Sequence, residues 1–419
     1  MRADGKPALL FLSPLMPAEG GNGLAMRAGA TLEALAARYA VHLLVIPMVG
    51  AAESPGRAVR NWCARVLVHP PDRHVDPLFR LIAGVRDPQE RLKALLAYPR
   101  PSLCRFATSA SVGEAAALAA LGSLGSGSGY RAVHVLRLYL APFAEPYLAA
   151  RGPDRPRCHL DLDDHEATTR RRIAGLLREN GDEPAALVEE WEADRYEALG
   201  AALVPRFDRV YLAAPADRDL VAAGHPGPDV RLLPNVIRPP GRLAPPRDRE
   251  PFTFLFVGNF DYYPNHDAAR YFCAQVLPLL RVRAPGPFRV RFVGANPPAA
   301  VRALGCEPEV TVTGPVTDVT PWYESAHTVI VPVRAGGGTR IKIIEAFAHR
   351  RPVVSTDAGA EGLSVTAGRD LLLAGSPQEF AGHCARLMRD PALRRALAGQ
   401  GARFAEPRVP GLLRECLSG

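Results

Sequence analysis

The residues best suited to chemistry lie in one segment of the second half of the chain, GGGTRIKIIEAFAHRRPVVST (336–356). Its three consecutive glycines allow the backbone to wrap around an anion, and Thr339 is placed to begin a helix. Arg340 and Lys342 would then lie in the first helical turn, where a cation is unfavourable for the helix dipole. A bound diphosphate would neutralise both cations, so the segment predicts a phosphate-binding loop.

The composition makes this segment stand out further. The chain has 419 residues and 51 basic side chains, yet only Lys6, Lys93 and Lys342 are lysine. Scarce lysine, asparagine and isoleucine beside abundant arginine indicate a GC-rich, bacterial genome, so positions that hold the scarce residues are informative. Half of the eight isoleucines also lie in or just before this segment. Glu345, one turn after Lys342, could accept hydrogen bonds from ribose hydroxyls. The alternative is a salt-bridged surface helix.

A second glycine-rich stretch lies near the N-terminus, at Gly20-Gly21-Asn22-Gly23, with Arg27 one turn later. It is either a ligand-contacting loop or a plain turn. Neither this stretch nor the 336–340 loop has the order of a Walker loop or of a G-x-G-x-x-G fingerprint.

The second half of the chain predicts a doubly wound parallel sheet, because short apolar runs alternate with helical patterns across glycine-rich connections. The expected strands are 252–258, 288–294, 310–314, 328–333, 352–356 and 370–374, and the main expected helices are 267–281, 321–325, 339–349, 377–389 and 391–403.

The first half repeats the pattern less clearly. The expected strands are 8–13, 41–47, 132–136, 158–162, 208–213 and 230–235, with helices at 24–38 and 185–203. We interpret 8–13 as a buried strand rather than as part of a signal peptide, because prolines bound the run. Residues 50–130 give no clear order of elements.

These patterns predict an α/β chain of two domains. The expected divisions are an N-terminal domain, an interdomain linker, a C-terminal domain and a C-terminal segment: 1–236, 237–250, 251–403 and 404–419.

Ligands of open parallel sheets bind beyond the carboxyl ends of the strands, so the residues at those positions are candidates. In the second domain they are rich in glycine and asparagine: Gly258, Asn259, Gly294, Gly314, Val316, Gly336, Gly337, Gly338 and Thr339. The chain has seven asparagines, and four of them (Asn235, Asn259, Asn265 and Asn296) fall at or near predicted strand ends.

Three segments resemble a known family: VGNFDYYPNHDA (257–268), VTGPVTDVTPWY (312–323) and VPVRAGGGTRIKIIEAFAHRRPVVSTDAGAEGL (331–363). They are similar to the donor-binding domain of the retaining glycosyltransferases of family 4 (glycosyl transferases group 1), in its Gly-rich GGGTR-type subgroup. The resemblance implies the GT-B fold, in which two Rossmann-like domains with parallel sheets face across a cleft. It also implies that 1–236 is the acceptor domain and 251–403 the domain that binds the nucleotide-sugar donor. The segment 404–419 would then pack back on the first domain.

The resemblance also assigns roles to residues. The second Glu of the family's Glu-x7-Glu motif, which holds the ribose, falls on Glu345, whereas the first falls on Gly337, a departure from the motif. The family's Arg and Lys after the first strand of this domain have no Lys counterpart here, and we expect Arg340 and Lys342 to supply that charge. The resemblance implies retention of anomeric configuration without a metal, with the leaving diphosphate stabilised by cations and N–H groups.

Asp161-Leu162-Asp163-Asp164-His165 contains D-x-D, a metal-binding signature of a different glycosyltransferase fold. We expect no metal site. The segment follows a strand of the first domain, so Asp164 or His165 is a candidate acceptor contact. The alternative is a helix start that Asp163 or Asp164 caps.

These observations favour a hexosyltransferase that uses a UDP-, GDP- or dTDP-sugar as co-substrate, has no other cofactor, and acts on a small-molecule, glycan or lipid-linked acceptor. A related sugar-nucleotide epimerase and a non-catalytic nucleotide-sugar-binding protein remain alternatives. The net charge of +8 is a reason to consider nucleic acid or a membrane surface as a partner. The 43 acidic residues are interspersed with the 51 basic ones, however, which disfavours a nucleic-acid partner. Seven scattered cysteines and the absence of a 20-residue apolar stretch predict a cytoplasmic protein, with weak association with the inner membrane surface left open.

Overall fold

The computed structural model describes residues 5–47, 54–69, 84–97, 109–123, 129–238, 240, 251–408 and 410–417. These residues form two compact units, which are treated separately below. The first comprises the described residues of Met1–Pro234 and Leu413–Gly419, and the second is Asn235–Leu412. The expected linker 237–250 lies mostly outside the described residues.

The first unit contains a sheet of seven parallel strands in the order β3-β2-β1-β4-β5-β6-β7. The strands are β1 (Ala8–Ser13), β2 (Ala40–Val45), β3 (Cys63–Val68), β4 (Ala132–Leu136), β5 (Arg157–Asp163), β6 (Arg209–Leu212) and β7 (Asp229–Leu232). From β1 to β3, successive strands are added on one side of β1, whereas β4 to β7 are added on its other side. The position between β1 and β4 is therefore the topological switch point, where ligands of such sheets bind.

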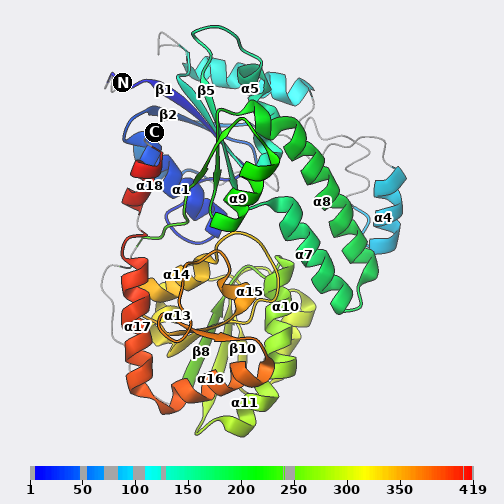
Figure 1. The fold of residues 1–419 in the computed structure, drawn as a ribbon, viewed down its shortest axis with the longest axis vertical. Coiled ribbons are helices and arrows are strands. Elements are labelled where there is room, and N and C mark those ends of the chain that lie inside the picture. The colour runs from blue at the N-terminus through cyan, green and yellow to red at the C-terminus, as the bar shows by residue number, and fades with distance from the viewer. Residues whose placement is uncertain are drawn as a thin grey trace. The chain divides into compact units, whose positions relative to one another are not determined.

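Both faces of this sheet are covered, which explains the continuous apolar runs of its central strands. Along β1, Leu10 and Leu12 join one core while Leu9 and Phe11 join the core on the opposite face. The helices of this unit are α1 (Gly23–Ala36), α2 (Arg57–Trp62), α4 (Pro88–Ala97), α5 (Ser109–Ser123), α6 (Glu145–Leu148), α7 (Glu166–Glu179), α8 (Glu183–Leu203) and α9 (Pro215–Gly224), of which α4 packs against α8. Helices α7 and α8 pack against each other as a long pair (Figure 1).

The second unit contains six parallel strands in the order β10-β9-β8-β11-β12-β13, so its switch point lies between β8 and β11. The strands are β8 (Phe252–Val257), β9 (Phe288–Val293), β10 (Val310–Val312), β11 (Thr328–Val331), β12 (Val353–Thr356) and β13 (Leu372–Ala374). Phe256 of β8 and Phe292 of β9 pack edge-on against each other, and Phe292 also packs edge-on against Phe272, which follows α10.

The helices of the second unit (Figure 1) are α10 (Tyr263–Tyr271), α11 (Leu277–Arg283), α12 (Ala299–Arg302), α13 (Thr320–Ser325), α14 (Ile341–Ala348), α15 (Asp357–Ala360), α16 (Pro377–Arg389) and α17 (Pro391–Ala405). A π-helical turn, Phe272–Val276, joins α10 to α11. The last helix is α18 (Pro410–Cys416); its Leu413 is buried, and Leu417 just beyond it packs against the core beside α1.

The predicted α/β class and the two parallel sheets are confirmed. All twelve predicted strands occur, with each end within three residues of its prediction, and β3 is an addition from the part of the chain that gave no clear order. The helix expected at 267–281 begins earlier, at Tyr263, because Pro264 occupies its first turn. No helix of the described residues is both long and apolar enough to cross a bilayer.

Candidate functional site

Three glycine loops meet at the carboxyl edge of the second sheet. The N–H of Gly258 donates to Val293 O at 3.0 Å, and the N–H of Gly294 donates to Gly314 O at 3.2 Å. Gly294 has φ +148°, and a Cβ there would come within 1.8 Å of Gly258 O. Only glycine allows the loops after β8 and β9 to approach this closely. Val316, two residues beyond Gly314, is half-buried.

The four asparagines singled out from the sequence all connect loops. Asn265 donates to Asn259 O at 2.8 Å, and Asn296 donates to Asn259 Oδ1 at 3.3 Å. Asn235 donates to Thr339 Oγ1 at 2.7 Å. Asn265 lies inside α10 rather than at a strand end. The amides therefore hold the carboxyl-edge loops in place.

Lys342 lies in the first turn of α14 and reaches back toward β8. Its Nζ donates to Asn265 Oδ1 at 2.5 Å and lies 4.2 Å from the centre of the Phe256 ring. Burial, and then the charge of Arg340, lower the pKa of Lys342 to about 7. No carboxylate within the described residues forms an ion pair with this ammonium group.

Arg340 is the residue that precedes α14, and its side chain is only 7% exposed. One guanidinium N–H donates to Gly337 O and another to Ala358 O at 3.2 Å, while Nε has no partner. By contrast, Arg334 on the same loop binds Asp267 through two hydrogen bonds. Among the described residues Arg340 has no carboxylate partner, so its buried charge is not compensated.

The expected helix start at Thr339 is wrong. The helix starts at Ile341, because the Thr339 hydroxyl is engaged by Asn235 and Arg340 takes the position before the first turn. Arg340 therefore lies outside the first turn, whereas Lys342 lies within it. Gly336 (φ +137°) and Gly338 (φ +63°) adopt conformations that favour glycine, which gives the loop its tight path between β11 and α14.

Glu345 lies one turn beyond Lys342 on α14. Burial raises the pKa of its carboxyl group to about 7, partly offset by a hydrogen bond from Tyr323 Oη to Glu345 Oε2 at 3.2 Å and by Lys342. Tyr323 is fully buried and stacks on His349 at 4.4 Å between ring centres. This support for Glu345 was not expected from the sequence, since nothing in the TPWY segment indicates that Tyr323 faces α14.

The glycine stretch of the first unit forms the start of α1. The side chain of Asn22 caps the helix by accepting from Leu24 N–H at 2.8 Å. Gly21 is exposed with φ +93°, and Gly23 is the first residue of the helix. These contacts are those of a capped loop, and they leave the Gly21 backbone open to solvent.

Arg27 is buried within the first unit. It is 3% exposed, donates to both carboxylate oxygens of Asp161, and donates to Leu233 O at 3.0 Å. The shortest contact with Asp161 is 2.6 Å. Arg27 therefore connects α1 to β5 and to the segment after β7. Its partner Asp161 is the first Asp of the D-x-D sequence.

Asp164 and His165 lie where β5 leads into α7. Asp164 accepts from Arg137 at 2.6 Å and from Thr169 Oγ1 at 2.7 Å. His165, not Asp163 or Asp164, is the capping residue of α7, because its ring accepts from Thr168 N–H. The described residues contain no group of three or more His, Cys, Asp or Glu side chains that could hold a metal.

Arg137 is a residue that the sequence did not reveal. It follows β4 with φ +77°, and Asp163, the last residue of β5, has φ +67°, conformations that are rare for residues other than glycine. Arg137 also donates to Glu166 Oε1 at 2.6 Å, and the other carboxylate oxygen, Oε2, is buried without a partner among the described residues. Two strained residues and a carboxylate with one unpaired oxygen thus gather at the carboxyl edge of the first sheet.

Residues 251–390 match the model of the family described as Glycosyl transferases group 1. A search of curated proteins gives no match. Among solved structures, the chain is similar to sucrose-phosphate synthase from Thermosynechococcus elongatus, with 15% identity, 99% of this chain and 98% of that chain covered, and a TM-score of 0.63.

Two further structures show the same likeness. One is Anabaena HepE in complex with UDP-glucose, with 14% identity, 98% of both chains covered and a TM-score of 0.62. The other is α,α-trehalose 6-phosphate synthase from Burkholderia multivorans, with 13% identity, 99% of this chain and 96% of that chain covered, and a TM-score of 0.61. The fold is therefore GT-B. Residues 251–390, which lie within the second unit, are in addition similar to the group 1 glycosyltransferase domain.

Proposed function

We propose that this chain transfers a sugar from a nucleotide-sugar to an acceptor with retention of anomeric configuration and without a bound metal. The observation that carries the proposal is the pair of cations at the carboxyl edge of the second sheet. Among the described residues, buried Arg340 has no partner at Nε, and Lys342 contacts the Asn265 amide and the Phe256 ring but forms no ion pair. Because an uncompensated buried cation is costly, the pair indicates an anionic ligand.

The same contacts suggest a role for each residue. Arg340, Lys342 and the backbone of Gly336–Thr339 would hold the diphosphate. Glu345, oriented by Tyr323, would accept hydrogen bonds from the ribose. The loops at Gly258-Asn259, Gly294 and Gly314–Val316 would line the remainder of the donor site.

In the proposed reaction the bond between the sugar C1 and the diphosphate oxygen breaks, and a bond to the acceptor oxygen forms on the same face. The acceptor proton passes to the departing diphosphate. Arg340 and Lys342 would stabilise the negative charge that develops on the leaving group, which is the main catalytic effect available to fixed cations.

The acceptor would bind to the first unit, near Gly21–Gly23, Arg27, Asp164 and His165. Asp164 and His165 lie beside the strained Arg137 and Asp163, and strain of this kind gathers at functional sites. A small molecule, a glycan or a lipid-linked saccharide fits this proposal, and a cytoplasmic enzyme at the inner face of the membrane would meet all three.

A thermal-shift screen of nucleotide-sugars tests the proposal. UDP-glucose is the first donor to try, because a similar structure holds it. A ligand at 100 times its Kd stabilises a protein by about 2.7 kcal/mol, which is a measurable rise in Tm. A flat response across UDP-, GDP- and dTDP-sugars would contradict the proposal.

A further inference from the structure

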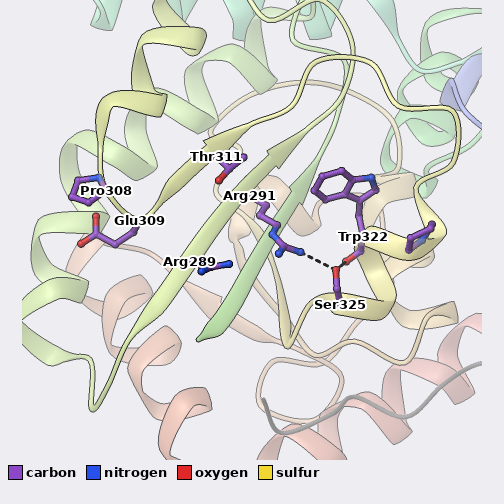
Figure 2. A pocket seen from close by; sticks show the side chains of 8 residues that line it. Arg289, Arg291, Pro308, Glu309, Thr311, Trp322 and Ser325 are labelled. Carbon is purple, nitrogen blue, oxygen red and sulfur yellow. Dashed lines mark hydrogen bonds between the residues drawn. The ribbon is translucent and has the colours of Figure 1, made fainter. Parts of the chain in front are cut away.

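A pocket of about 590 Å³ lies on the second unit, between the outer strands β9 and β10 and the short helix α13 (Figure 2). Its volume lies within the range of pockets that hold small ligands, roughly 300–1,000 Å³. Pro308 and Glu309 on its wall directly precede β10, so the pocket reaches the amino end of that strand. It is thus separate from the glycine loops, which follow the carboxyl ends.

Two arginines supply the charge of this pocket. Arg289 and Arg291 are alternate residues of β9 and therefore project from the same face of the sheet. Arg291 donates to Ser325 Oγ at 2.9 Å and lies 5.6 Å from the centre of the Trp322 ring (Figure 2). Within the described residues neither arginine has a carboxylate partner. Burial, and then the charge of Arg289, lower the pKa of Arg291, as expected for two neighbouring cations.

Glu309 is the carboxylate in the wall of this pocket, and it is already engaged. Arg281 donates to its two oxygens at 3.0 and 2.6 Å, and binds Glu307 as well. The carboxylate therefore does not neutralise Arg289 or Arg291, and the positive charge of the pair faces the pocket.

The rest of the wall suits a sugar ring. The half-buried indole of Trp322 offers an apolar face, and the hydroxyl groups of Thr311 and Ser325 offer hydrogen-bonding groups. We propose that the pocket binds an acidic saccharide, whose carboxylate or phosphate contacts Arg289 and Arg291 while its ring lies against Trp322. The anion follows from the arginines alone, whereas the choice of a saccharide rests on the proposed glycosyltransferase function.

Calorimetric titrations test this proposal with glucuronate, glucose, inorganic phosphate, uridine monophosphate and a hyaluronan tetrasaccharide. We expect glucuronate to bind at least tenfold more tightly than glucose, and at least tenfold more weakly to the variant with Arg289→Gln and Arg291→Gln. Trp322→Leu should weaken glucuronate but leave inorganic phosphate unchanged. If the tetrasaccharide binds more tightly than glucuronate, the natural ligand is part of a glycan chain. If the two bind equally, the natural ligand is a single acidic sugar.

Arg395→Gln, which removes an exposed arginine of α17 outside the pocket, is the matched control and should bind glucuronate as the wild type does. Three results would overturn the proposal. The first is no glucuronate binding at millimolar concentration, and the second is equal affinity for glucuronate and phosphate with no effect of Trp322→Leu. The third is that uridine monophosphate binds more tightly than glucuronate and that the pocket variants abolish this binding. Nucleoside diphosphate binding should be intact in the pocket variants. Failure of this site is thereby distinguished from failure of the donor site, which Arg340→Gln tests independently.

Discussion

Lys342 and Glu345 lie one helical turn apart on α14, and burial brings the pKa of each to about 7. The ammonium form of Lys342 is therefore present below about pH 7 and is lost as the pH rises through that value. A carboxyl group with a raised pKa behaves in the opposite sense, and Glu345 ionises as the pH rises. The two side chains would give nucleotide binding a pH dependence near neutrality.

The first prediction concerns Lys342. Relative to Lys342→Met, the affinity of the wild type for a nucleoside diphosphate should fall as the pH rises from about 6 to about 8.5, since Lys342 loses its proton over this range while Glu345 ionises in both proteins. At pH 6 the affinity of Lys342→Met should be at least tenfold weaker than that of the wild type, and this gap should narrow as the pH rises. Calorimetry at several pH values measures both effects. If the pH profiles of the two proteins are parallel, Lys342 does not contact the diphosphate.

The second prediction concerns Glu345. If its carboxylate accepts hydrogen bonds from the ribose, the wild type should bind UDP more tightly than 2′,3′-dideoxy-UDP by about 1.5–3 kcal/mol, the strength of a hydrogen bond to a charged group. Glu345→Ala should bind both nucleotides equally. Tyr323→Phe serves as the intermediate case, because it removes the donor to Glu345 Oε2 but keeps the carboxylate. A difference between the nucleotides that persists in Glu345→Ala would exclude the ribose role.

How far the site could be predicted differs among these residues. The segment that contains Arg340, Lys342 and Glu345 stood out because scarce residue types gather there, and local spacing decides which side chains share a turn. The partners that give Arg27 and Lys342 their environments lie 134 and 77 residues away in the chain, at Asp161 and Asn265. Local spacing carries no information about such distant contacts.

Among the elements, the loops after β8 and β9 depend most on a single residue. Gly294→Ala would place a methyl group within 1.8 Å of Gly258 O at a φ of +148°. We predict a loss of at least about 3 kcal/mol of stability and loss of nucleotide binding, because the loops must separate. Gly305→Ala, whose Cβ would meet no atom within 4 Å, is the matched control and should change stability by less than about 1 kcal/mol. Chemical denaturation and calorimetry of both variants measure the outcome, and equal stabilities would show that the approach of the loops is not required.

Element types were predictable where burial is uniform. The central strands β1, β8 and β11 are covered on both faces and therefore read as apolar runs. Strand β3 lies at the edge of its sheet with most of its residues partly or fully exposed, and its sequence CARVLV carries a weaker signal. The start of α14 was misplaced because the hydroxyl of Thr339 accepts a hydrogen bond from Asn235. Asn235 lies 104 residues away in the chain, so local sequence does not reveal this contact.

At the scale of the whole molecule, the first sheet contains histidines that oppose folding in acid. His134 is fully buried between Phe11, His159 and Tyr211, and neither ring nitrogen has a partner in the described residues. Burial lowers the pKa of His134 and of His159 to about 3. The unfolded chain binds these protons below about pH 6.5 and the folded chain does not, so stability should fall as the pH drops from about 6.5 toward 3.

His134→Phe tests this expectation. Lowering the pH from 7 to 4.5 should reduce the stability of the wild type by about 2–3 kcal/mol through His134 alone, and the variant should lack that share. Urea denaturation at each pH gives both values, and the phenyl ring preserves the packing against Phe11 and Tyr211. The same decrease in both proteins would show that His134 is protonated in the folded state or does not limit stability.

Both sheets share the reversal of strand order at their switch points, and the second has Arg340 and Lys342, which form no ion pair among the described residues, at its carboxyl edge. The central claim is that Arg340 binds the diphosphate of a nucleotide-sugar. The most direct test is calorimetry of Arg340→Gln with the nucleoside diphosphate that the thermal screen selects, beside the bare nucleoside and the Arg395→Gln control. We predict at least 30-fold weaker binding of the diphosphate, about 2 kcal/mol, with the nucleoside and the control unchanged. Diphosphate binding within threefold of the wild type, about 0.7 kcal/mol, would contradict the account.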